Sequence, residues 1–266
     1  MGPRNHDTVA LFEEAASWDA FGDNPYLEER NRIVLSMLPQ AAQSVVDVGC
    51  GNGVLLRALA LSRSVVGLDP SRRALAAFEG PRVCALGERL PLRSGSVDVA
   101  CALEVLEHLD GASVLACCAE LSRVARRWIL IGTPDRENPL RNALRCPRCG
   151  EIFNRSHHLQ SFDESRIASL FPEFAPLSVK NGGQRVRGYL RPLLWLRHRL
   201  AGRFYSGPGE TRGLCPACGN REFPRFRHNL PSLMLDGVNR LLSPRRPYWV
   251  LVLLERRQDG RIGGAA

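Results

Sequence analysis

The sequence is poor in lysine and has no long apolar run. All but one of its 36 basic residues are arginine, the exception being Lys180. No stretch of about 18 apolar residues is present, which argues against a membrane-spanning helix. Residues 1–25 also lack the pattern of a signal peptide, so we expect a cytoplasmic protein. The apolar fraction of 44% is enough to form a sizeable core.

Acidic side chains are scarce in one part of the chain. Residues 184–246 carry 13 basic and 3 acidic side chains, whereas residues 1–183 carry 20 and 22. The formal net charge of +9 therefore comes almost entirely from a single stretch. Basic stretches of this kind bind RNA or an anionic membrane surface in some proteins, and in others they are only solvated faces.

Cysteine is used in two ways. Five of the nine cysteines are scattered through apolar segments, where small core residues are expected. The other four form two pairs, Cys146 with Cys149 and Cys215 with Cys218, and each pair has the form C-P-x-C-G. In a reducing compartment, paired C-x-x-C motifs favour a bound metal over disulfides.

Strands and helices alternate from Ser44 onward, which is typical of a parallel sheet covered by helices on both faces. We therefore predict a doubly wound α/β fold with seven strands, mostly parallel. Ser71 and Asp110 are placed to begin two of the helices. The predicted strands are 44–49, 64–69, 82–86, 96–103, 127–134, 176–180 and 248–257. The predicted helices are 54–63, 72–79, 111–125 and 163–171.

The alternation becomes irregular after Pro134. Two irregular insertions, 135–162 and 183–246, each contain one of the cysteine pairs. Two helices over 6–21 and 24–38 form the predicted N-terminal cap, in which Trp18 and Tyr26 are candidates to close over a cofactor. The predicted parts are a cap over 1–43, a core over 44–182 and 247–258, a basic insertion over 183–246, and a flexible tail over 259–266.

A glycine-rich loop follows the first predicted strand in VVDVGCGNG (45–53). Its glycines allow a tight turn and a close approach to a ligand, and the next helix offers free N–H groups. Asp69 comes 22 residues after Asp47, at the end of the second strand. A carboxylate at that place can accept hydrogen bonds from both hydroxyls of a ribose.

Together with ERLPLRSGSVDVACALEVLEHL and RWILIGTP, these motifs resemble those of the class I S-adenosylmethionine-dependent methyltransferases. The resemblance spans residues 45–134, and it implies a Rossmann-like methyltransferase fold with S-adenosyl-L-methionine as cofactor. One position departs from the pattern: many relatives have an aspartate for the adenine amine where this chain has Leu86, so Glu88 is a candidate substitute. The residues that the resemblance places at the cofactor are Asp47, Gly49, Gly51, Asn52, Gly53, Asp69, Glu88, Leu90 and Glu104.

The stretch EVLEHL follows the fourth strand and leaves two alternatives open. In the first, Glu104 shapes the cofactor pocket and His108 is a general base with a pKa in the neutral range. In the second, the stretch resembles the E-x-x-E-H run that binds a metal in ubiquinone-pathway O-methyltransferases and in small-RNA 2′-O-methyltransferases. A hard cation such as Mg²⁺ or Mn²⁺ could then bind two neighbouring substrate hydroxyls. The candidate ligands are Glu104, Glu107, His108, His157 and His158.

The two cysteine pairs are predicted to share one zinc ion. The loop after the fifth strand and the hairpin before an antiparallel seventh strand leave the same edge of the sheet, where ligands bind in this fold. Four thiolates complete a closed tetrahedral site that has no open position for catalysis. We therefore predict that Cys146, Cys149, Cys215 and Cys218 hold a structural zinc, which pins the two insertions as a lid over the substrate pocket.

The segment RVRGYLRPLLWLRHRLAGRFYSG (185–207) mixes arginines with Tyr189, Trp195 and Phe204. Such a mixture can stack on bases and bind phosphates, or it can lie on anionic lipid headgroups. The simplest interpretation is a helix whose apolar side packs on the lid while its arginines face water.

Three functions follow from these patterns. The first is S-adenosylmethionine-dependent methylation of a small-molecule metabolite, most plausibly at oxygen. The second is the same chemistry on RNA, of the 2′-O type, with the basic insertion binding the nucleic acid. The third is a zinc-bearing binding module whose cofactor site is vestigial.

Overall fold

The structure is a computed structural model that describes residues 13, 25–202, 213–224 and 227–258. The predicted helix over 6–21, Trp18, the side chain of Tyr26 and the predicted tail over 259–266 lie outside the described residues. Of the predicted N-terminal cap, helix α3 (Pro25–Met37) is described.

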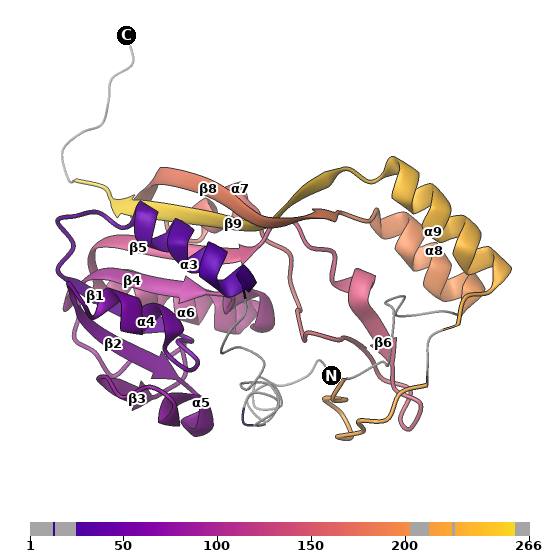
Figure 1. Cartoon of the computed structure of the whole chain (residues 1–266), viewed down its shortest axis with the longest axis horizontal. Coiled ribbons are helices and arrows are strands. Elements are labelled where there is room, and N and C mark those ends of the chain that lie inside the picture. The colour runs from indigo at the N-terminus through magenta and orange to yellow at the C-terminus, as the bar shows by residue number, and fades with distance from the viewer. Residues whose placement is uncertain (1–12, 14–24, 203–212, 225–226, 259–266) are drawn as a thin grey trace, which may run out of the picture.

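A seven-stranded sheet with the strand order β3-β2-β1-β4-β5-β9-β8 forms the centre of the molecule (Figure 1). Strands β1 to β5 run parallel, whereas β9 is antiparallel to both of its neighbours, β5 and β8. The predicted doubly wound, mostly parallel sheet of seven strands is therefore confirmed. Its strands are β1 (Ser44–Val48), β2 (Ser64–Asp69), β3 (Arg82–Cys84), β4 (Val97–Leu103), β5 (Ala125–Pro134), β8 (Phe174–Arg187) and β9 (Arg245–Arg256).

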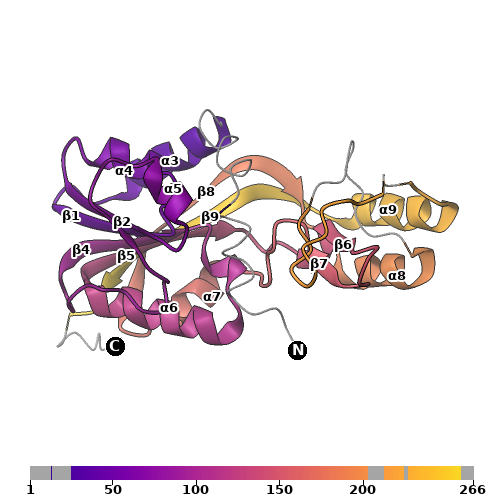
Figure 2. The same cartoon turned by 90° about the horizontal axis from the view of Figure 1, so that it is seen from below.

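Helices cover both faces of this sheet (Figure 2). Helices α3, α4 and α5 lie on one face, and α6 and α7 lie on the other. The central strands are buried on both sides, as their nearly continuous apolar runs predict for parallel strands. The remaining helices of the core are α4 (Val54–Leu59), α5 (Arg72–Ala76), α6 (Gly111–Val124) and α7 (Glu164–Ser169).

The helix starts follow from capping side chains. Ser71 accepts a hydrogen bond from the N–H of Ala74 and begins α5, and Asp110 accepts one from the N–H of Ser113 and begins α6. Both caps were predicted, because a short oxygen-bearing side chain satisfies an N–H group that the first turn leaves without a partner. The predicted helix over 54–63 is shorter in the structure and ends at Leu59.

The first insertion folds into a small unit of its own. A 3-10 turn η2 (Pro139–Asn142) leads into the two-stranded sheet of β6 (Ala143–Arg145) and β7 (Ile152–Asn154). The turn between these strands holds the first cysteine pair. Asp135 and Phe162, at the two ends of the insertion, form a parallel bridge that closes it against the core.

The second insertion stands on a long two-stranded arm. Strand β8 was predicted over 176–180 only, but it continues to Arg187 and stays paired with β9 back to Arg245. The arm leads to two helices that lie side by side, α8 (Arg191–Ala201) and α9 (Leu230–Leu242), at the end of the molecule opposite β3 (Figure 1). Helix α9 was not predicted from the sequence.

Candidate functional site

The carboxyl ends of β1, β2, β4 and β5 meet at one edge of the sheet, because these strands are parallel. The glycine loop leaves β1 there, Asp69 ends β2, and Glu104 follows β4. The amino-terminal half of β9 reaches the same edge, with Trp249 opposite Pro134. The glycine loop, Asp69, Glu104 and the starts of the two insertions are therefore brought together at this edge.

The loop after β1 requires glycine at two positions for reasons of space as well as of conformation. Gly49 and Gly53 have φ angles of 74° and 73°, which side chains rarely adopt. A Cβ atom on Gly49 would come within 2.4 Å of Val105, and one on Gly53 within 2.5 Å of Phe78. The loop therefore has no side chain at these two positions, which lets a ligand approach its backbone closely.

Asp69 is buried and holds the loop in place. Its two carboxylate oxygens accept the N–H groups of Gly51 and Ser71, each at 2.8 Å. Burial raises the pKa of Asp69, and these two N–H groups partly offset the increase. Each oxygen retains a further lone pair, so the carboxylate can still accept hydrogen bonds from a ribose.

Asp47 is a buried acid without a full set of partners. Its Oδ1 atom has no hydrogen-bond partner within the part of the chain that the structure describes. Burial raises the pKa of Asp47 to about 7, although the positive charge of Arg30 on α3 lowers it. A buried carboxylate in this state is favourable for a positively charged ligand, which would compensate the loss of solvation.

Glu104 lies directly after β4 in a conformation that glutamate seldom adopts, with φ of 58°. Its Oε1 atom is buried without a hydrogen-bond partner among the described residues, and burial raises its pKa to about 7. Arg30 again lowers the pKa, so this one guanidinium lies near both buried acids. Strain at a buried acid is a feature of functional sites.

These groups fit S-adenosylmethionine, which carries a sulfonium and an ammonium charge next to a ribose. The bare loop offers room, and Asp47 and Glu104 offer buried negative charge with one oxygen each left without a partner. Asp69 offers acceptor oxygens at the place where the resemblance puts the ribose.

The remaining predicted cofactor residues are placed less uniformly. Asn52 lies within the loop and Glu88 is half-buried in the turn after β3, near the predicted adenine position, whereas Leu86 is exposed there. Leu90 has a different role: its side chain is in the core, its N–H donates to Glu120, and its carbonyl accepts from Arg123. Because its side chain is buried and both of its backbone polar groups are hydrogen-bonded within the protein, Leu90 is a poor candidate for binding the cofactor.

A second group of side chains lies beside this edge. One ligand atom each from Glu107, His108 and His158 lies within 4.8 Å of the others, although His158 belongs to the first insertion. Glu107 is 1% exposed, and neither of its carboxylate oxygens has a hydrogen-bond partner in the described chain. Two imidazoles and one carboxylate are a donor set that binds divalent metals. The structure does not bring Glu104 or His157 into this group.

Each of the two imidazole rings in the group is oriented by a hydrogen bond to another part of the chain. His158 Nδ1 is hydrogen-bonded to the carboxylate of Glu137, and the ring of His108 is hydrogen-bonded to the backbone of His157. Metal-binding histidines usually donate their second ring N–H to a carboxylate or a backbone carbonyl, which orients the ring and sets its tautomer. The arrangement around Glu107, His108 and His158 follows that pattern.

His157 faces a different neighbour from His158. Its ring lies against the backbone carbonyl of Leu214 and packs on Phe153, with ring centroids 5.5 Å apart. Leu214 precedes Cys215, so His157 joins the first insertion to the second. A positive φ of 59° at His157 lets two successive histidines point to different partners.

The pKa of His108 differs from the neutral range that the sequence suggested. Burial lowers it well below the usual histidine value, and the neighbouring His158 and His157 lower it further. His108 is therefore a neutral but weak base. His158 shows the opposite behaviour: burial lowers its pKa, but Glu137, Glu107 and Glu104 outweigh this and raise it to about 9.

The four paired cysteines converge although they come from two insertions. Their Sγ atoms all lie within 4.8 Å of one another. The Sγ atoms of Cys146 and Cys218 are 3.6 Å apart, and those of Cys149 and Cys215 are 3.5 Å apart. Four sulfurs around a tetrahedral zinc, each about 2.3 Å from the metal, are separated by about 3.8 Å. The spacing of the thiols thus fits a zinc ion.

The two halves of the cysteine cluster have the same local fold. In the first, the N–H of Gly150 donates to the carbonyl of Cys146, and in the second the N–H of Gly219 donates to that of Cys215. Both glycines have positive φ, 79° and 69°, which explains the final glycine of each C-P-x-C-G.

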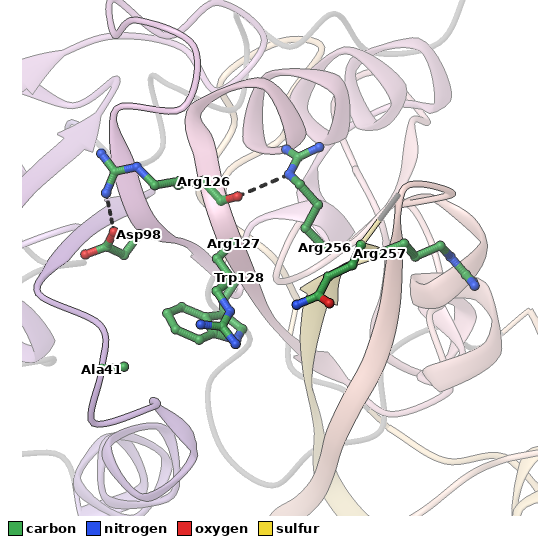
Figure 3. A pocket seen from close by; sticks show the side chains of 8 residues that line it. Ala41, Asp98, Arg126, Arg127, Trp128, Arg256 and Arg257 are labelled. Atoms are coloured by element: carbon green, nitrogen blue, oxygen red, sulfur yellow. Dashed lines mark hydrogen bonds and ion pairs between the residues drawn. The ribbon is translucent and has the colours of Figure 1, made fainter. Parts of the chain in front are cut away.

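The pocket in Figure 3 lies at the opposite edge of the sheet, where β4 and β5 begin and β9 ends. Three of the four guanidinium groups that line it are already paired: Arg126 with Asp98, Arg127 with Glu255, and Arg256 with Glu173. This pocket is therefore separate from the cofactor loop and has little unpaired charge.

Three residues at the site were missed in the sequence. Glu137 orients His158, and Arg30 lies near two buried acids. Burial raises the pKa of Tyr248, and the nearby Glu104 and Glu107 raise it further. Arg30 and Glu137 carry no local motif. Tyr248 begins the predicted last strand at the ligand edge, and that position was the available signal.

Comparison with known proteins agrees with this geometry. Residues 46–128 match the family model described as "Methyltransferase domain". A "Ubiquinone biosynthesis O-methyltransferase" of Thiobacillus denitrificans is 33% identical over an alignment of 146 positions, and the match covers 48% of this chain and 62% of that protein. An enzyme of the same name from Ralstonia nicotianae is 37% identical over an alignment of 123 positions, and the match covers 39% of this chain and 50% of that protein. The chain thus covers less than two thirds of these relatives.

Solved structures have the same fold over most of the chain. The Burkholderia thailandensis 1,6-didemethyltoxoflavin-N1-methyltransferase, solved with its substrate and S-adenosylhomocysteine, has a TM-score of 0.55 and 12% identity, and covers 97% of this chain and 92% of its own. The Haloferax volcanii complex of the Trm112 methyltransferase activator with a methyltransferase also has a TM-score of 0.55, at 14% identity, covering 96% and 97%. The chain therefore has the Rossmann-like fold of S-adenosylmethionine-dependent methyltransferases.

Proposed function

We propose that the protein is an S-adenosylmethionine-dependent methyltransferase that methylates a hydroxyl group of a small molecule. The observation that carries the proposal is the placement of buried, incompletely paired carboxyl groups of Asp47 and Glu104 around a bare glycine loop. The family match over residues 46–128 and the resemblance to ubiquinone-pathway O-methyltransferases support the same activity.

The group of Glu107, His108 and His158 supports oxygen as the acceptor. A divalent cation bound there, Mg²⁺ or Mn²⁺, would supply the positive charge that lowers the pKa of a substrate hydroxyl. In that role Glu107 neutralises charge, while Glu137 and the backbone of His157 keep the two imidazoles oriented. Because methyl transfer needs mainly alignment and a deprotonated acceptor, these few side chains are enough for the chemistry.

The cysteine cluster has a supporting role in this proposal. A structural zinc on Cys146, Cys149, Cys215 and Cys218 would fix the two insertions to each other. His158 comes from the first of these insertions, so the cluster holds one wall of the substrate site in place. Pinned in this way, the two insertions would form the lid predicted from the sequence, and residues 135–162 would be its part beside the ligand edge.

The first test is methyl transfer by the purified full chain, using a small catechol as the acceptor because it has two neighbouring hydroxyls. We expect binding of S-adenosylmethionine without added metal, and transfer that depends on Mg²⁺ or Mn²⁺. Elemental analysis after mild chelation should still find one zinc, since four thiolates retain the metal far better than a mixed site does.

His158→Ala is the informative variant and His198→Ala its matched control, because His198 lies on α8, outside the group at the ligand edge. We expect the first to lose metal-dependent transfer while cofactor binding remains, and the second to retain both. Transfer that needs no divalent metal and survives His158→Ala would contradict the metal-assisted mechanism. Failure to bind S-adenosylmethionine would contradict the proposed function itself.

A further inference from the structure

Helix α9 has its polar and apolar faces exchanged. An ordinary surface helix buries its apolar side chains and exposes its polar ones. In α9 the buried positions are Ser232 and Asn239, and Ser243 directly after the helix is buried as well. Its exposed large apolar side chains are Leu230, Leu233, Met234, Val238, Leu241 and Leu242.

The inward polar side chains are engaged either with α8 and its approach or within α9 and its own termini. Asn239 Oδ1 accepts the N–H of Leu190 at 2.8 Å and the hydroxyl of Ser243 at 2.9 Å. Asp236 forms an ion pair of 2.7 Å with Arg197, which is only 2% exposed. Turning α9 to bury its leucines would leave a buried guanidinium without its partner, which is strongly unfavourable. The outward apolar face is therefore fixed by the interior.

The exposed side chains form one continuous stripe. Leu230, Met234, Val238 and Leu241 follow one another at helical spacing and are 71%, 64%, 44% and 85% exposed. A stripe of this kind on a helix usually marks an interaction surface. No helix in the described residues is long and apolar enough to cross a membrane.

Positive charge flanks the stripe at both ends. Arg227 precedes α9, Arg240 lies in its last turn and Arg245 follows it, and all three are exposed. Within the described part of residues 184–246, the acidic side chains are Glu222 and Asp236, of which Asp236 is paired with Arg197.

We propose that the hairpin of α8 and α9 docks on the surface of an anionic lipid bilayer, with α9 lying in the plane of the interface. Leucine, methionine and valine side chains would enter the boundary of the acyl chains, while the arginines contact phosphate headgroups. A helix of 13 residues is about 20 Å long, which is too short to span the hydrocarbon layer but sufficient to lie along it.

The chemistry of the stripe favours a bilayer over other occupants. RNA-binding surfaces combine positive charge with aromatic rings that stack on bases, and the exposed stripe of α9 is aliphatic. A second copy of the chain would place the flanking arginines of two hairpins near one another, where like charges repel. An anionic bilayer complements both the apolar face and the charge.

The place of the hairpin in the molecule suits this occupant. The arm of β8 and β9 holds α8 and α9 at one end, away from the sheet and its helices (Figure 1). A flat surface can therefore reach the hairpin without meeting the core. The proposal does not depend on methyl transfer, because it rests only on the hairpin.

The test is flotation of the full chain with vesicles of phosphatidylglycerol and phosphatidylcholine, compared with vesicles of phosphatidylcholine alone. We expect binding to the anionic vesicles that weakens as salt is raised. The double substitution Leu233→Asp with Leu241→Asp should weaken this binding by at least about tenfold, because it removes buried apolar contact and adds repulsion.

Leu61→Asp provides the matched control, since Leu61 is 89% exposed but lies between α4 and β2, far from the hairpin. Circular dichroism and thermal unfolding should show that all variants are folded, because each changed leucine is at least half exposed. Binding by the Leu61→Asp variant should equal that of the parent chain.

Each of the following results would overturn the proposal. One is an absence of flotation with anionic vesicles, or equal flotation of the double variant and Leu61→Asp. Another is a lipid-free dimer in sedimentation that the double variant converts to a monomer, which would assign the stripe to a second copy. The last is retention of single-stranded RNA that the same double variant abolishes.

Discussion

The sheet and the cysteine-bearing insertions are held together by different means. On the two faces of the sheet, large clusters of buried side chains pack between strands and helices. Around the cysteine cluster, the buried hydrophobic cluster of the described residues consists of Leu144, Cys146, Phe153 and Cys215. Two of these four are metal-ligand candidates, so this small core is largely the site itself.

This difference indicates which part of the molecule would depend on the proposed zinc for its stability. A sheet with two apolar faces can fold by burial alone, because the hydrophobic contribution grows with the area removed from water. A unit of a few apolar residues cannot, and such units are commonly stabilised by zinc. The ligand edge lies where the two regions meet, since it takes Glu107 and His108 from the core and His158 from the insertion.

The largest effect is expected from Glu107→Gln, at the junction of the two regions. The substitution keeps the shape of a buried side chain but removes the charge that a divalent cation requires. We expect methyl transfer to fall by about a hundredfold to ten-thousandfold, with little change in the affinity for S-adenosylmethionine. Single-turnover kinetics and calorimetric titration measure the two quantities, and unchanged transfer would show that the metal group is not used.

The next largest effect is expected from a substitution in the cysteine cluster, which should affect the insertions but not the sheet. Cys215→Ser should abolish zinc retention and reduce transfer by about tenfold to a hundredfold, because His158 and Glu137 lose their support. Cys84→Ser is a suitable control, since that cysteine is exposed on strand β3 of the sheet and does not belong to the cysteine cluster. Hydrogen exchange should increase in residues 135–162 and remain unchanged in β1 and β4. An equal increase in hydrogen exchange in β1 and β4 would mean that the stability of the sheet also depends on the cysteine cluster.

A third prediction concerns the pH dependence of cofactor binding on the core side. Burial raises the pKa of Asp47 to about 7 in the free protein, and a positively charged ligand favours its ionised form. Affinity should therefore be constant above pH 7 and fall by up to about tenfold for each pH unit below it. Asp47→Asn should bind more weakly and show a shallower dependence on pH, because the pKa of Glu104 is also raised to about 7 by burial and that dependence remains. A parent chain whose affinity does not change between pH 6 and 8 would contradict the assignment.

The smallest effect is expected at the far edge of the sheet. Burial raises the pKa of Asp98, but hydrogen bonds from the N–H groups of Gln43 and Ser44 and the charge of Arg126 outweigh this and lower it. A lowered pKa adds stability above the unfolded value and loses it as pH falls through the folded value. Asp98→Asn should reduce the free energy of unfolding at pH 7 by about 1 kcal/mol. In urea titrations, the difference in the free energy of unfolding between the parent chain and Asp98→Asn should become smaller at acidic pH. A difference that does not change with pH would show that it does not come from the lowered pKa of Asp98.

Much of the core could be predicted because its signals are local. Ser71 and Asp110 cap helices through contacts three residues away, and the glycine loop must be bare wherever it occurs. The convergence of the four cysteines followed from topology, since both insertions leave the same edge. These features need no knowledge of distant packing.

The features that were missed depend on contacts between distant residues. The existence of helix α9 had local signals, because Asn229 caps its first turn and its apolar residues recur at helical spacing. The face that it buries could not be predicted, since that depends on contacts with α8 such as the ion pair between Asp236 and Arg197. The length of β8 depends on its pairing with β9. The different directions of His157 and His158 depend on a positive φ that the letters of the sequence do not reveal.

The spacing of the cysteine pairs also determines the order in which the protein can assemble. Cys149 and Cys215 are 66 positions apart, and α7, β8 and α8 lie between them. Closing so long a loop is entropically costly until intervening structure has brought its ends together. A zinc ion at this cluster would therefore bind late, after β8 has joined the sheet. If the proposed zinc site is correct, a molecule that holds the metal has already completed its fold, and the zinc content of a preparation would measure its fraction of correctly folded protein.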